Sequence, residues 1–111
     1  MFPASKTSVS IDDSLKLLVV IVCYKVVDLT IACLRSLEAE VRDLPGTRVA
    51  VCENGTGGNA EARLREAIDA NGWNEWVELT AIYPNRGFTG GNNHVLRQAL
   101  ASADPPQYVL L

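Results

Sequence analysis

Apolar residues in this chain occur as short continuous runs separated by segments with helical spacing. Residues 17–24 are continuously apolar and rich in β-branched side chains, which is typical of a strand buried on both faces of a parallel sheet. Residues 47–53 predict a second strand, and an apolar run from residue 107 predicts a fourth. Residues 76–82 alternate between apolar and polar side chains, so we expect this third strand to lie nearer an edge of the sheet.

Amphipathic segments between these runs predict three helices. Asp28 is expected to cap the first helix and Asn59 the second, which the pair Asn71 and Gly72 would close. The third helix follows a glycine-rich stretch at residues 85–93, and its apolar positions continue to about Ala103. We expect residues 85–93 to form a tight loop that opens this helix.

Strands and helices therefore alternate, which predicts a three-layer α/β/α, Rossmann-like fold with a parallel sheet in the order 3-2-1-4. The winding reverses between the first and fourth strands. Ligands of open α/β sheets bind beside such a reversal, outside the carboxyl ends of the strands. We expect Tyr24, Glu53 and residues 85–93 to meet there.

Domain organisation follows from where the regular pattern begins and stops. Residues 1–16 are polar and without a sustained period, which predicts a flexible leader. Residues 17–111 form one predicted unit, and its last apolar run has no polar turn after it. We therefore expect the chain to be the N-terminal part of a longer domain.

Composition narrows the functional classes. The chain has 111 residues, 48% of them hydrophobic, and a formal net charge of −3, which disfavours nucleic-acid or anionic-membrane binding. The apolar run at residues 17–23 is far shorter than the roughly 20 residues of a membrane span. Cys23, Cys33 and Cys52 show no CxxC spacing, so we expect reduced thiols, a cytoplasmic location and no zinc site.

Motif spacing excludes two common nucleotide-binding classes. A dinucleotide-binding unit needs G-x-G-x-x-G after its first strand, and residues 23–28 contain no glycine. The P-loop pattern is absent as well. The strand ends carry instead an aromatic ring at Tyr24, a carboxylate at Glu53 and an amide at Asn54, and these groups suit a nucleobase and a ribose better than a bare phosphate.

Short motifs at the predicted strand ends resemble a known family. They are VIVCY at residues 20–24, VCENGT at 51–56, NRGFTGGNN at 85–93 and YVLL at 108–111. In order and spacing they resemble the N-terminal half of family 2 glycosyltransferases of the GT-A fold. The glycine-rich motif is most similar to that of rhamnosyltransferase-like members, and the resemblance covers residues 17–111.

The resemblance implies that the chain binds the nucleotide of a UDP- or dTDP-sugar for inverting transfer to a hydroxyl of a saccharide or lipid-linked acceptor, as in polysaccharide biosynthesis. Cys23 and Tyr24 would line the base pocket. Glu53 would replace the family's usual aspartate, which binds the base or ribose. Asn54 would shape that loop, and the far side of the nucleotide would be closed by Gly87, Gly91 and Asn92.

In this family a divalent metal, Mg²⁺ or Mn²⁺, neutralises the donor diphosphate, and a later carboxylate acts as base. The resemblance places the metal-binding aspartates just after Leu111, so it implies no catalytic residue and no metal ligand within residues 1–111. The chain alone would be inactive. The full-length enzyme would be cytoplasmic or peripheral at the inner membrane.

A different class of function stays open from the residues alone. The fourth predicted strand would lie at an edge of the sheet, and an open edge can pair with another chain. The alternative is thus a non-catalytic α/β interaction module that associates with a partner, or with a second copy of itself, through this edge.

Overall fold

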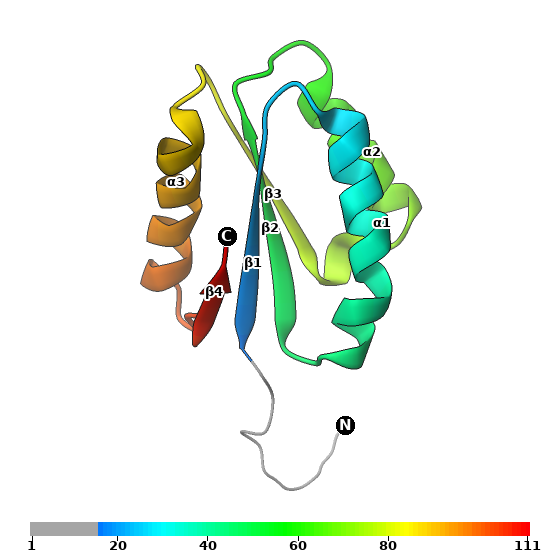
Figure 1. Cartoon of the computed structure of the whole chain (residues 1–111), viewed down its shortest axis with the longest axis vertical. Helices are drawn as coiled ribbons and strands as arrows, with labels where there is room; N and C mark the ends of the chain where they lie inside the picture. The colour runs from blue at the N-terminus through cyan, green and yellow to red at the C-terminus, as the bar shows by residue number, and fades with distance from the viewer. Residues whose placement is uncertain (1–15) are drawn as a thin grey trace, which may run out of the picture.

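The computed structural model describes residues 16–111, and the predicted leader, apart from Lys16, lies outside these residues. Strands and helices alternate along the chain, as the sequence predicts (Figure 1). Among the described residues, none of the helices has the length and apolar character needed to cross a membrane. In chain order the elements are β1 (Leu17–Cys23), α1 (Val27–Asp43), β2 (Thr47–Asn54), α2 (Ala60–Ala70), the 3-10 turn η2 (Trp73–Glu75), β3 (Val77–Ile82), α3 (Gly87–Ala101) and β4 (Tyr108–Leu110).

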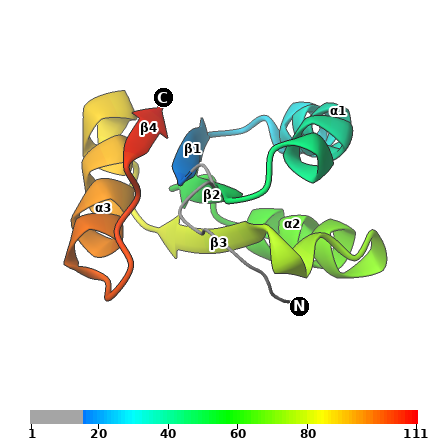
Figure 2. The same ribbon diagram turned by 90° about the horizontal axis from the view of Figure 1, so that it is seen from below.

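The four strands form one parallel sheet in the order β3-β2-β1-β4, which confirms the predicted fold class and strand order. β3 lies at an edge, as its alternating sequence predicts. Figure 2 shows α1 and α2 on one face of the sheet and α3 alone on the other. This division follows from right-handed crossovers, because the chain steps in one direction from β1 to β3 and then back to β4.

Both faces of the central strands are buried, which explains their continuous apolar sequences. Along β2, Val49 and Val51 join the core beneath α1 and α2, together with Leu34, Leu64 and Trp73. The alternate residues Ala50 and Cys52 join a second core beneath α3, together with Leu18, Val20 and Val95. The strands therefore hold a rigid frame for the residues at their ends.

Two predicted helix starts are wrong. Asp28 is not the cap of α1, because Val26 occupies that position and Asp28 lies in the first turn, where it pairs with Arg63 of α2. Residues 87–91 are not a loop, because α3 already begins at Gly87. Gly91 serves close packing, because a Cβ there would lie 3.0 Å from Cγ1 of Val22.

Candidate functional site at the carboxyl ends of the strands

The carboxyl ends of β1, β2 and β3 share one rim of the sheet with the start of α3. A hollow of about 540 Å³ opens at this rim. It lies beside the reversal of winding between β1 and β4, the position where ligands of open α/β sheets bind. Its lining residues are Val22, Tyr24, Val26, Asn54, Asn85, Gly87 and Phe88.

Asn54, the last residue of β2, builds one wall of this hollow. Its side chain is only 1% exposed. Nδ2 donates to the carbonyl oxygen of Gly87 at 2.8 Å, and Oδ1 accepts the backbone N–H of Arg86 at 3.0 Å. Both ends of the amide therefore bond the segment before α3, whereas the resemblance had Asn54 shaping the loop after β2.

The segment between β3 and α3 rests directly on the end of β2. Gly55 has a φ of +88°, and a Cβ there would lie within 2.6 Å of the Cα of Asn85. Oδ1 of Asn85 accepts the N–H of Gly87 at 2.6 Å, which closes a tight turn before the helix. The wall formed by residues 54–55 and 85–87 is therefore fixed by backbone contact.

Tyr24 follows β1 and stands at the mouth of the hollow with 43% of its surface exposed. The next residue, Lys25, has a φ of +59°, and its N–H donates to Oγ1 of Thr56 at 2.8 Å. Lys25 Nζ lies 5.1 Å from the centroid of the Tyr24 ring. The turn after β1 is thus tied to the loop after β2, and the ring stays open to solvent.

Glu53 reaches the same rim but does not line the hollow. It is buried, and both carboxylate oxygens accept the backbone N–H of Thr56, at 3.1 and 3.3 Å. Side chains alternate along a strand, so Glu53 lies on the face of α1 and α2, opposite Asn54. Its carboxylate holds the loop after β2, and its predicted contact with a base or ribose stays a prediction.

The remaining predicted residues lie around the hollow at different depths. Gly87 lines it, whereas Cys23 is fully buried in the core beneath α1 and α2. Gly91 lies behind it against Val22 and Asn54. Asn92 is buried, with Nδ2 donating to the carbonyl oxygen of Phe88 at 3.0 Å and Oδ1 without a partner among residues 16–111.

Asn85 and Phe88 also line the hollow; both lie in the predicted stretch at 85–93, but neither was singled out as a site residue. Phe88 lies in the first turn of α3 and is 65% exposed. A signal for it existed, because Phe88 is the only large apolar residue within the glycine- and amide-rich stretch at 85–93.

The buried thiols near the strand ends are suited to packing in the core and not to nucleophilic chemistry. Burial raises the pKa of the Cys52 thiol, and the nearby Glu53 carboxylate raises this pKa further. A thiol held in its protonated form is a poor nucleophile. Cys23, Cys33 and Cys52 are all free, and the first and last are buried.

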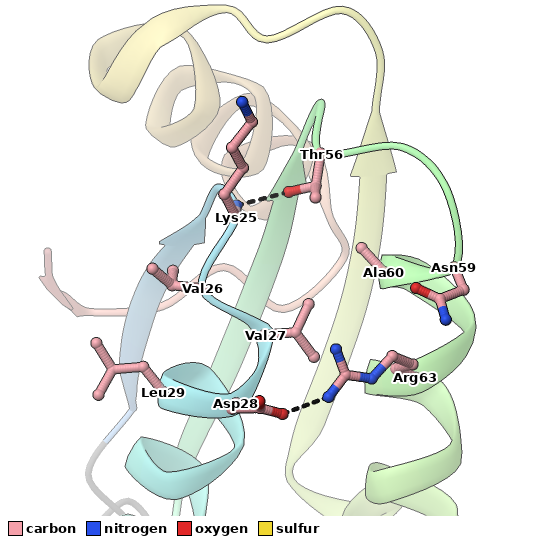
Figure 3. A pocket seen from close by; sticks show the side chains of 9 residues that line it. All are labelled: Lys25, Val26, Val27, Asp28, Leu29, Thr56, Asn59, Ala60 and Arg63. Carbon is pink, nitrogen blue, oxygen red and sulfur yellow. Dashed lines mark hydrogen bonds and ion pairs between the residues drawn. The ribbon is translucent and has the colours of Figure 1, made fainter.

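A second hollow, of about 290 Å³, opens between the starts of α1 and α2 (Figure 3). Asp28 and Arg63 point toward one another across it and form an ion pair, so the arginine charge is already neutralised. Lys25 extends away from this pair. Within residues 16–111, no group of three or more His, Cys, Asp or Glu side chains is placed to hold a metal ion.

Comparisons with known proteins assign no family to the chain. No protein-family model matches it, and neither a curated protein nor a solved structure is found to match. Its function is therefore inferred from the geometry of the rim and from the sequence motifs at the strand ends.

Proposed function

We propose that the chain is the nucleotide-binding part of an inverting glycosyltransferase, and that the hollow at the carboxyl rim takes the base and ribose of a UDP- or dTDP-sugar. The observation that carries this proposal is the open ring of Tyr24 at the mouth of a hollow with fixed walls, beside the reversal of winding in a parallel sheet.

The exposed ring of Tyr24 in the lining of the hollow supports a ligand with a flat apolar part. Stacking of a base on an aromatic side chain contributes about 1–3 kcal/mol. Because Asn54 fixes the wall before any ligand arrives, little ordering cost opposes binding.

Sugar transfer also requires groups that act on the diphosphate and on the acceptor hydroxyl. A divalent metal would neutralise the leaving diphosphate, and a base would deprotonate the acceptor hydroxyl. The described residues contain no side-chain cluster that fits such a metal. In this proposal residues 16–111 bind and orient the nucleoside, and the chemical step belongs to residues that the resemblance places after Leu111.

Titration calorimetry with UDP and dTDP tests this proposal. We expect binding in the high micromolar range or weaker, because the proposed metal ligands are missing. Tyr24→Ala should abolish it. Tyr83→Ala is the matched control, since Tyr83 lies at the same rim, is 74% exposed and does not line the hollow. Sub-micromolar binding of a nicotinamide or flavin cofactor would refute the proposal.

A second candidate function rests on β4. This short strand pairs with β1 on one side only, and Tyr108, Val109 and Leu110 are all exposed. Such an edge can accept a strand from a partner or from a second copy of the chain. Size-exclusion chromatography with light scattering separates the two functions, because a tight oligomer that binds no nucleotide would favour the interaction module.

A further inference from the structure

The sequence contains two Asn-Gly dipeptides, and the fold gives them different surroundings. Asn54-Gly55 lies at the end of β2, and Asn71-Gly72 lies at the end of α2. An asparagine followed by glycine can react with its own backbone, because glycine has no Cβ to hinder the approach of the next nitrogen. The burial and the hydrogen bonds of each dipeptide therefore decide where the folded chain can react.

This reaction exchanges one bond at the side-chain carbon for another. The backbone nitrogen of the glycine loses its proton to base and bonds to Cγ of the asparagine, and the bond between Cγ and Nδ2 breaks. Nδ2 takes up a proton from water and leaves as ammonia, so that a five-membered succinimide ring remains. Water then opens the ring at Cγ to give aspartate, or at the backbone carbonyl carbon to give isoaspartate.

Asn54-Gly55 is enclosed by the segment before α3. Asn54 is 1% exposed, and its amide bonds the carbonyl oxygen of Gly87 and the N–H of Arg86. A Cβ on Gly55 would lie 2.3 Å from the backbone nitrogen of Asn85, which shows how closely the two backbones approach. Base and water reach this dipeptide only after the segment before α3 has left the end of β2.

Asn71 makes as many side-chain hydrogen bonds as Asn54, but it makes them at the surface. Its Nδ2 donates to the carbonyl oxygen of Ala67 at 2.8 Å, and its Oδ1 accepts from the Arg35 guanidinium at 3.2 Å. Asn71 and Arg35 are both exposed, so water competes for these bonds. Exposure therefore distinguishes the two asparagines, whereas the number of their hydrogen bonds does not.

The attacking nitrogen of Gly72 becomes available through a local opening. Its N–H donates to the carbonyl oxygen of Asp69 at 3.2 Å, in the last turn of α2. Gly72 has a φ of +70°, and a Cβ there would meet nothing within 4 Å. Helix ends open more readily than buried strand ends, and opening this one turn frees both the nitrogen and the amide of Asn71.

We propose that Asn71 deamidates spontaneously while the chain is folded, and that Asn54 is protected until the chain unfolds. The co-reactants are base and water, which the solvent supplies. Each conversion turns a neutral amide into a carboxylate, so it adds one negative charge to a chain whose formal net charge is −3. This inference does not depend on the proposed nucleotide-binding function.

The product would weaken the connection between α2 and β3. Trp73 follows Gly72 and is fully buried. Arg35, which donates to Oδ1 of Asn71, has its Cζ 5.5 Å from the centroid of the Trp73 ring. Isoaspartate inserts one more carbon into the main chain before Gly72, which shifts the residue that leads into this buried ring. We expect the aged chain to unfold at a lower urea concentration than the fresh chain, and an unchanged midpoint would overturn this part of the inference.

Peptide mapping by mass spectrometry tests the inference on the full 111-residue chain, kept at mildly alkaline pH. In the folded chain, aspartate and isoaspartate should accumulate at residue 71 at least about tenfold faster than at residue 54. In guanidinium chloride both dipeptides are open, so the two rates should become similar. Equal rates at the two residues of the folded chain, including no reaction at either, would overturn the inference.

Gly72→Ala tests the chemical route. The new methyl group meets no neighbour, although the positive φ makes the variant less stable. It should slow the reaction at residue 71 by at least about tenfold and leave residue 54 unchanged, because the methyl group hinders the attacking nitrogen. The same contrast should appear in guanidinium chloride, where the fold of the variant has no influence. An unchanged rate at residue 71 in the denatured variant would show that this residue does not react through Gly72 and would overturn the inference.

Discussion

The side-chain amide of Asn54 donates to the carbonyl oxygen of Gly87 at 2.8 Å, and this bond joins the end of β2 to the start of α3. The same side chain accepts the N–H of Arg86. One buried residue thereby fixes the distance between the central sheet and the turn that forms the far wall of the hollow. The shape of the candidate site depends on this pair of contacts.

Asn54→Ala should destabilise the fold by about 1–3 kcal/mol, because it removes the two hydrogen bonds that the buried Asn54 side chain makes to the carbonyl oxygen of Gly87 and the N–H of Arg86. Urea unfolding measures this change. Asn59→Ala is the control: Asn59 is exposed and makes no side-chain capping bond, so its effect should stay within about 0.5 kcal/mol. Equal losses in the two variants would show that Asn54 does not hold the wall.

Gly55 and Gly58 offer a matched pair within one loop. Both have positive φ angles, but a Cβ on Gly55 would collide with Asn85, whereas one on Gly58 meets nothing within 4 Å. Gly58→Ala should cost about 1–2 kcal/mol from backbone conformation alone. Gly55→Ala should cost at least about 2 kcal/mol more and shift the amide resonances of residues 85–87. If the two variants have the same stability, the loop does not rest on Asn85.

Gly91→Ala separates helix propensity from packing. In an open helix this change would stabilise by about 1 kcal/mol. Here the new methyl group would lie 3.0 Å from Cγ1 of Val22 and 3.1 Å from Nδ2 of Asn54, so we expect a net loss of about 1–2 kcal/mol. Thr89→Ala, at an exposed position of the same helix, should stabilise by about 0.5 kcal/mol. A stabilising Gly91→Ala would contradict the close approach of α3 to β1.

The sequence predicts the fold well because the pattern of apolar residues along each strand reflects which of its faces are buried. A continuous apolar run such as residues 17–23 fits only a strand covered on both faces, and the alternation in β3 marks an edge. The order of strands then follows from right-handed crossovers and the direction of each step. Local propensity misled at residues 87–91, which are helical, and there Gly91 allows close contact between α3 and β1.

The candidate site was predicted less completely. Motif position indicates which residues reach the rim: Tyr24, Asn54 and Gly87 line the hollow, whereas Cys23, Gly91 and Asn92 do not. Motif position does not indicate which way a side chain points or what it contacts. Glu53 is engaged by the N–H of Thr56, which depends on the shape of the loop after β2 and is invisible in the sequence. Phe88 stands out in the sequence as the large apolar residue of the stretch at 85–93, but its exposure at the hollow becomes evident only once α3 is placed.

Cys52 predicts a pH dependence of stability. Burial, followed by the Glu53 carboxylate, raises the pKa of its thiol in the folded chain above the ordinary value of about 8.5. Above that value the unfolded chain releases the proton while the folded chain keeps it, so the free energy of unfolding falls as the pH rises.

Cys52→Ala should therefore lose less stability than the unmodified chain between pH 8 and 10, as urea unfolding would measure. Cys33→Ala, at an exposed position, should behave like the unmodified chain, and identical slopes for all three would contradict the raised pKa.

The most direct measurement is a titration of the isotope-labelled chain with UDP, followed by the backbone amide resonances of the non-proline residues. We predict that shifts concentrate at Tyr24, Val26, Asn85, Gly87 and Phe88, around the hollow at the carboxyl rim. A separate hollow of about 390 Å³ lies near the amino ends of the strands, and the resonances of two of its lining residues, Gly46 and Ala99, should stay unchanged. Shifts confined to Gly46 and Ala99, or the absence of any shift at millimolar UDP, would contradict this prediction.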